Sequence, residues 1–179
     1  DLLSRARDNG FSTLVVTADV PGPSRREDMA RAGAPIGSRN AMSLTPQFLW
    51  QSMTHPAWAL AAVQNGGKFR FKNLEPYYGA GSFDNITQFI GSQLNGSLDW
   101  DYLNEIRAAW DGPLILKGIL NGQDATRAVA AGVDGLIVSN HGGRQLDAVP
   151  ASIDLLEAIR SSVGPKVPLL FDSGVRSGL

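Results

Sequence analysis

Four short and mostly apolar runs divide the chain and predict buried strands. They are residues 13–17, 113–116, 135–138 and 167–171. Because polar residues do not alternate within the runs, the pattern favours parallel strands that are covered on both faces. Each run is followed by polar residues, namely Asp19, Lys117, Ser139 with His141, and Asp172. The carboxyl ends of parallel strands carry the chemistry in (β/α)8 barrels and in open doubly wound sheets, so we expect a functional site there.

Helical patterns lie between the apolar runs. They cover residues 1–7, 101–110, 122–131 and 150–160. The third pattern stops at Gly132 and the fourth near Gly164, and glycine is the usual residue just after a helix. The alternation of strand and helix predicts an α/β fold built from βαβ units with right-handed crossovers.

A long segment interrupts this alternation. The interval from Asp19 to Lys117 is too long for one βα unit, so residues of about 27–96 form an insertion on the active-site side of the strands. Leu49, Trp50 and Met53 have helical spacing within it. Pro56 opens a second short helix through residue 63, which the run Asn65-Gly66-Gly67 ends.

Composition narrows the classes of function. The 179 residues, 43% apolar and 18% charged, suit one globular domain. A net charge of -1 gives no general electrostatic reason to bind nucleic acid. The absence of cysteine rules out disulfides and fits a reducing compartment. With two histidines, a His-rich metal centre is excluded and no metal site is expected. No apolar run reaches the roughly 20 residues that span a bilayer.

The most specific motif follows the third run. A histidine and an arginine three residues apart, His141 and Arg144, are separated by two glycines and offer a proton acceptor beside a bidentate carboxylate clamp. A 2-hydroxy acid substrate needs both groups. The run Asn-His-Gly-Gly-Arg-Gln-Leu-Asp over residues 140–147 resembles the signature of the FMN-dependent 2-hydroxy acid dehydrogenases and oxidases, the family of L-lactate dehydrogenase, mandelate dehydrogenase and glycolate oxidase. A histidine merely hydrogen-bonded in a loop is the alternative, and the surrounding motif disfavours it.

The resemblance implies catalytic and substrate-binding roles. His141 matches the base that takes a proton from the substrate while two electrons pass to the flavin, as a carbanion or as a hydride. Asp19 matches the aspartate that stabilises the resulting imidazolium; by itself it would equally suit a turn residue. The substrate-binding residues are then Arg144, Arg26 and His141, and no role follows for the adjacent Arg25.

The resemblance also implies FMN as the cofactor. Lys117 matches the lysine at the N1–C2=O edge of the flavin, where a cation stabilises the anionic reduced ring. Residues 172–176 match a stretch in which the aspartate accepts ribityl hydroxyls and the arginine pairs with phosphate. The full set of expected cofactor contacts is Thr17, Lys117, Ser139, Gly142, Asp172, Ser173, Gly174, Val175 and Arg176.

The resemblance extends over residues 1–179 and implies a TIM (β/α)8 barrel. The four strands match the fourth to the seventh of that barrel, with the insertion after the fourth, so the chain is expected to be a partial barrel and inactive alone. The implied reaction is oxidation of an (S)-2-hydroxy acid, with L-lactate the leading substrate and a quinone or oxygen as acceptor. Mandelate- and glycolate-specific members stay open, as does a non-catalytic half-barrel. Isoprenoid diphosphate isomerisation on a similar barrel needs no carboxylate clamp and is disfavoured.

The resemblance further implies a homo-oligomer, a tetramer when complete, in the cytoplasm. In some family members the insertion contacts the inner face of the cell membrane. Aromatic and basic side chains in this insertion would suit such a contact, and packing of the aromatics on the barrel is the alternative. They are Trp50, Trp58, Phe69 and Phe71 with Arg39, Lys68, Arg70 and Lys72. His55, before Pro56, matches no catalytic position and is interpreted as a helix-start residue.

Overall fold

The chain divides into two compact units. One is formed by Asp1–Arg25 with Leu94–Leu179, and the other by Arg26–Gln93. The computed structural model describes residues 2–20, 46–65, 74–78, 89, 92, 98–146 and 148–177. Predicted site residue Arg26 lies outside these ranges, as do Arg39, Gly66, Gly67, Lys68, Phe69, Arg70, Phe71, Lys72 and Asp147.

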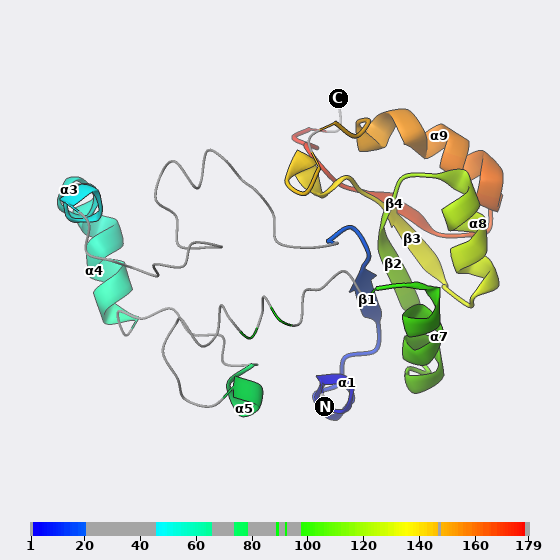
Figure 1. Ribbon diagram of the computed structural model, residues 1–179, viewed down its shortest axis with the longest axis horizontal. Helices are drawn as coiled ribbons and strands as arrows, with labels where there is room; N and C mark the ends of the chain where they lie inside the picture. The colour runs from blue at the N-terminus through cyan, green and yellow to red at the C-terminus, as the bar shows by residue number, and fades with distance from the viewer. Residues whose placement is uncertain are drawn as a thin grey trace. The chain divides into compact units, whose positions relative to one another are not determined.

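The first unit is built on a parallel sheet with its strands in sequence order, as Figure 1 shows. The strands are β1 (Leu14–Thr17), β2 (Leu114–Ile119), β3 (Gly135–Val138) and β4 (Leu169–Phe171). The continuous apolar runs therefore predicted all four strands correctly, together with their parallel pairing. The α/β class is confirmed.

One helix precedes the first strand and three lie between strands, where the sequence predicts them. They are α1 (Leu2–Asp8), α7 (Trp100–Ala109), α8 (Gly122–Ala130) and α9 (Ser152–Val163), with a short turn η1 (His141–Gly143) after β3. Side-chain caps fix two of the starts: Asp99 accepts from the Tyr102 N–H, and Asn121 accepts from the N–H groups of Gln123 and Asp124. Such caps satisfy amide groups that have no partner within the helix.

The sheet has two different faces. The face against the helices is buried, because alternate strand residues pack on the apolar sides of α7, α8 and α9. Its strand members are Val16, Leu114, Leu116, Leu136 and Val138. On the opposite face Val15 is 47% and Leu170 50% exposed. The strand side chains that reach the predicted site belong to this face opposite the helices.

One strand end differs from the prediction. The sequence predicted that β2 stops at residue 116 with Lys117 at its end, whereas the strand continues through Ile119. Its register with β3 shifts between Lys117, which pairs with Ile137, and Ile119, which pairs with Val138. Gly118 is the extra residue in this β-bulge, and a bulge changes which face the following side chain reaches.

Two arginines hold the loops at the amino ends of the strands. Arg107 donates to the carbonyls of Trp110, Gly112 and Gly132 and to the Asp134 carboxylate, which also accepts from the Leu114 N–H. Arg160 donates to the carbonyls of Gly164 and Val167. We call the Arg107 arrangement the amino-end clamp.

The second unit contains helices α3 (Pro46–Thr54), α4 (Pro56–Gln64) and α5 (Glu75–Tyr78). The first two confirm the helices predicted from the spacing of Leu49 to Met53 and from Pro56. His55 is the residue just before α4, as predicted. None of the helices in the described ranges has the length and apolar character that crossing a membrane requires.

Candidate active site

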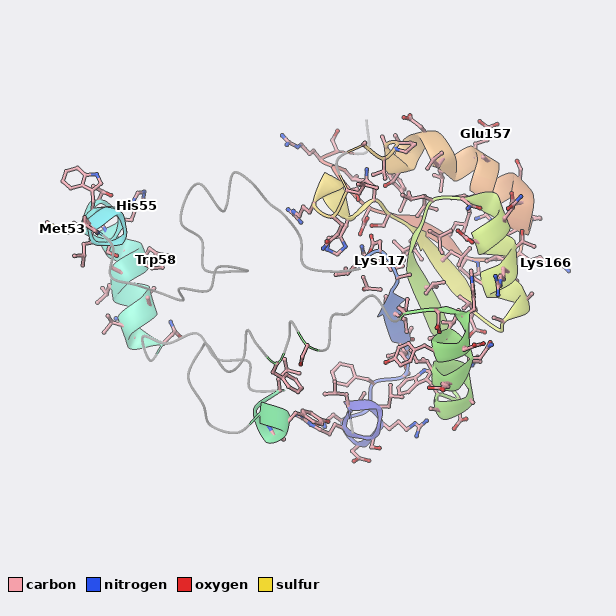
Figure 2. All side chains as sticks on the ribbon, in the orientation of Figure 1. Met53, His55, Trp58, Lys117, Glu157 and Lys166 are labelled. Atoms are coloured by element: carbon pink, nitrogen blue, oxygen red, sulfur yellow. The ribbon has the colours of Figure 1, made fainter. Side chains whose placement is uncertain are left out.

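Polar side chains from four strand ends meet at the carboxyl edge of the sheet. Asp19 follows β1, Lys117 lies in β2, Ser139 and His141 follow β3, and Asp172 follows β4. Figure 2 shows Lys117 at this edge. We call these five residues the carboxyl-edge cluster. They are separated by as much as 153 positions in the sequence, from 19 to 172, and only the parallel order of the strands brings them together.

His141 and Asp19 form the first pair of the cluster. The Nδ1 atom of His141 lies 3.1 Å from Oδ1 of Asp19. A carboxylate can only accept a hydrogen bond, so Nδ1 carries a proton, and in the neutral ring Nε2 is then the atom with the free lone pair. Asp19 is almost buried, whereas the His141 side chain keeps partial exposure. The pair therefore presents an oriented proton acceptor to the solvent side of the sheet edge.

Lys117 lies between two carboxylates. Its Nζ atom is 3.3 Å from Asp172 Oδ2 and 3.7 Å from Asp19 Oδ2. It also donates a hydrogen bond of 2.8 Å to the Ser139 hydroxyl. The lysine is mostly buried, but these three oxygen atoms take the place of water around its ammonium group. They offset the cost of removing an ammonium from water.

Ser139 connects the other members. Its hydroxyl accepts from Lys117 and from the His141 N–H at 3.1 Å, and donates to Asp19 Oδ2 at 3.5 Å. The side chain is fully buried. The sequence suggested Ser139 as a cofactor contact and missed this connecting role, although its position between a buried strand and His141 was an available signal.

A left-handed turn presents His141. The φ angles of His141, Gly142 and Gly143 are 56°, 67° and 68°. Glycine adopts such angles without strain, whereas the histidine needs support from its surroundings. Asn140 gives that support: its side chain accepts from the Gly142 N–H and donates to the Pro150 carbonyl, and its own N–H donates to Ser152 Oγ. The sequence pattern assigned no separate role to Asn140 or Ser152.

The loop after β4 joins the same site. Ser173 Oγ donates to Asp172 Oδ1 at 2.9 Å and accepts from the Gly142 N–H at 3.0 Å. Partial burial raises the pKa of Asp172, but the nearby Ser139 hydroxyl, the hydrogen bond from Ser173 and the charge of Lys117 outweigh it and leave this pKa below its ordinary value. Asp172 is therefore an anion at neutral pH.

The remaining predicted residues surround the cluster. Thr17 is exposed at the end of β1 and pairs in register with Lys117. Arg144 closes the His141 turn through its N–H bond to the His141 carbonyl, and its side chain is exposed. Gly142 is exposed within the turn. Val175 and Arg176 are exposed after β4, and Gly174, with a φ of 87°, has nothing within 4 Å of the position of a Cβ.

The exposed groups at this edge fit a ligand with hydroxyl and phosphate groups. Asp172, 44% exposed, offers an anionic acceptor, and Arg176 offers an exposed guanidinium. The open space at Gly174 lets a ligand approach the backbone. Within the described ranges no group of three or more His, Asp or Glu side chains is arranged to hold a metal ion.

Comparisons with known proteins agree with this arrangement. Residues 1–179 match a family model described as FMN-dependent dehydrogenase. The L-lactate dehydrogenase of Pseudomonas entomophila (strain L48) is 44% identical over 179 residues, and that of Pseudomonas aeruginosa (strain LESB58) is 40% identical over 178. Each alignment covers 99% of this chain and 45% of the relative, so the chain spans less than half the length of these relatives.

Solved structures also match the chain over almost its whole length. The monotopic membrane protein (S)-mandelate dehydrogenase matches with a TM-score of 0.80 and 29% identity, covering 97% of this chain and 44% of that protein. A mandelate oxidase matches with a TM-score of 0.66 and 31% identity, covering 99% of this chain and 40% of that protein. The parallel sheet and its helices therefore have the fold of the corresponding part of these enzymes.

Proposed function

Because this chain belongs to the FMN-dependent dehydrogenase family, we propose that it carries the catalytic base and part of the cofactor site of a flavoenzyme that oxidises (S)-2-hydroxy acids to 2-oxo acids. The observation that carries the proposal is the His141–Asp19 pair, 3.1 Å apart, in the same cluster as Lys117. The oxidation removes two protons and two electrons from the substrate. It therefore requires a proton acceptor, and a nearby cation favours the reduced, anionic flavin.

In this proposal His141 is the base. Its Nε2 atom accepts a proton from the substrate, and the positive charge that forms on the ring is stabilised by Asp19. Bound FMN supplies the acceptor for the two electrons. The exposed guanidinium of Arg144, three residues after the base, binds the substrate carboxylate. Arg26 is proposed as a second substrate contact from the sequence alone.

The cofactor would be held by residues of this same edge. Lys117 would lie by the flavin ring, where a cation favours the anionic reduced form. Asp172 would accept hydrogen bonds from the ribityl hydroxyls, and Arg176 would pair with the phosphate. The other proposed contacts, carried over from the family motif, are Thr17, Ser139, Gly142, Ser173, Gly174 and Val175.

L-lactate is the leading substrate. The relatives at 40% and 44% identity are L-lactate dehydrogenases, whereas the solved neighbours at 29% and 31% act on mandelate by name. The electron acceptor is a quinone or oxygen. A mandelate- or glycolate-specific enzyme is the competing proposal.

Anaerobic reduction tests the proposal in an FMN-loaded protein that contains this sequence and has the full length of the L-lactate dehydrogenase relatives, and the same protein serves for every flavin measurement below. L-lactate should bleach the flavin absorbance, D-lactate should not, and (S)-mandelate and glycolate should react more slowly. Equal rates with L-lactate and (S)-mandelate would contradict the substrate assignment. If none of these acids reduced the flavin, the proposed activity itself would be wrong.

We further propose a peripheral membrane contact through α3 and α4. Residues 46–64 contain no Asp, Glu, Lys or Arg, and the large apolar side chains described among them are exposed, with Trp50 at 66% and Met53 at 75%. Exposed apolar surface of this kind suits an interfacial site. The description of one structural neighbour as a monotopic membrane protein supports the same proposal.

Sedimentation with anionic phospholipid vesicles tests the contact. Replacing Trp50 and Met53 with serine should lower the bound fraction, because the inserted apolar area is lost. Leu146→Ser is the matched control, since Leu146 is also an exposed apolar residue but lies in the other unit. Unchanged binding of the Trp50/Met53 variant would contradict the proposal.

A further inference from the structure

Gly118 is the residue at which β2 stops being a regular strand. Its φ of 102° is in the region that favours glycine, and it is the extra residue of the bulge between the Lys117–Ile137 and Ile119–Val138 pairs. In a regular strand, residues two apart point to the same face. Here Lys117 joins the carboxyl-edge cluster, whereas Ile119 is packed in the core at 5% exposure.

The space beside Gly118 is occupied by Asp19. A Cβ atom built on Gly118 would lie 2.6 Å from both Cβ and Cγ of Asp19 and 2.8 Å from its backbone N, where ordinary contacts begin at 3.4 Å. The preceding residue, Ala18, donates its N–H to the Lys117 carbonyl at 2.8 Å. This bond holds the backbone next to Asp19 against β2. The Asp19 backbone therefore cannot move away from Gly118 without breaking the bond.

We propose that Gly118 is a positioning residue for His141, which it orients through Asp19. A methyl group at Gly118 must move the Asp19 side chain by about 1 Å to restore ordinary contact. A displacement of that size is enough to break a bond that is now 3.1 Å long. The catalytic consequence rests on the proposed role of His141 as the base.

The test compares Gly118→Ala with Gly164→Ala. Gly164 has a similarly positive φ of 75°, but a Cβ there meets nothing within 4 Å, so this control keeps the backbone strain and omits the collision. The first measurement is the proton NMR signal of the hydrogen-bonded His141 ring N–H. It should be seen in the native protein and in Gly164→Ala, and be lost in Gly118→Ala.

The second measurement is stopped-flow flavin reduction of the FMN-loaded protein. Gly118→Ala should slow reduction by about 100-fold, the effect of misplacing a catalytic group by about 1 Å. Binding of FMN should be unchanged. In an Asp19→Ala background, adding Gly118→Ala should change the rate by less than about twofold, because coupled residues are not additive. If the two effects multiply instead, Gly118 does not act through Asp19 and the inference is overturned.

Two further results keep the inference separate from the proposed function. If the native protein oxidises no hydroxy acid, the proposed function fails, but the His141 ring signal still tests Gly118: its persistence in Gly118→Ala overturns the inference. If Gly118→Ala does not fold, adding Asp19→Gly should restore part of the folding, because it removes both side-chain atoms that the methyl meets and leaves only the contact with the Asp19 N. A double variant that folds no better than Gly118→Ala overturns the inference, because the Asp19 side chain is then not what the methyl displaces.

Discussion

Replacing Lys117 with methionine should destabilise the folded protein by about 3 kcal/mol at neutral pH. Methionine has a similar length but removes the cation that lies 3.3 Å from Asp172 and 3.7 Å from Asp19. Breaking a buried ion pair costs about 3–5 kcal/mol, because the remaining charge is left without compensation. The lower end applies here, since Asp172 is 44% exposed and water screens its share.

The loss should depend on pH. The pKa of Asp172 lies below its ordinary value, with the charge of Lys117 among the causes. A carboxyl group whose pKa is lower in the folded state stabilises the fold above its unfolded pKa, and this contribution disappears as pH falls through the folded value. The difference between the native protein and Lys117→Met should therefore be largest near pH 7 and shrink below about pH 4.

Urea unfolding followed by circular dichroism at pH 7, 4 and 3 measures this difference. Lys166→Met is the matched control, because Lys166 is an exposed lysine near the amino end of β4, away from the cluster, as Figure 2 shows. It should change the free energy of unfolding by less than about 0.5 kcal/mol. A loss for Lys117→Met that is no larger than the control, or that is the same at all three pH values, would refute the electrostatic reasoning.

Three other changes have definite expected results. His141→Gln should slow flavin reduction by at least about 100-fold and leave FMN bound, which stopped-flow absorbance measures. Arg144→Lys should weaken oxalate binding, monitored by flavin absorbance, far more than FMN binding, because lysine lacks the planar pair of donors; unchanged oxalate affinity would move carboxylate binding to Arg26. Arg107→Ala should lower the free energy of unfolding by about 3 kcal/mol, since two partly buried carbonyls, a third carbonyl and the Asp134 carboxylate lose a donor, and calorimetry checks this.

The strands and the identity of the site were predictable because they depend on local sequence. A continuous apolar run predicts a buried parallel strand wherever it occurs, and the polar residues just after each run must then meet at one edge. The pairing of His141 with Asp19, implied by the family resemblance, agrees with the 3.1 Å contact.

The details that escaped prediction depend on tertiary contacts. Nothing local distinguishes Gly118 from a glycine that simply ends a strand, because its bulge is defined by the register of β2 against β3. In the same way, a serine after a strand gives no sign of how many partners its hydroxyl will have. Ser139 connects Asp19, Lys117 and His141, and the first two of these are far from it in the sequence.

The amino-end clamp has a consequence for hydrogen exchange. Arg107 ties three backbone carbonyls and Asp134 together, and the Leu114 amide donates into the same group. Local opening there must break several bonds at once, so the Leu114 amide should exchange with deuterium only in rare, large-scale opening. The amides of Gly142 and Gly143 lie in an accessible turn at the other end of the sheet and should exchange much sooner. Local opening should therefore be more frequent at the carboxyl edge than at the opposite end of the same strands.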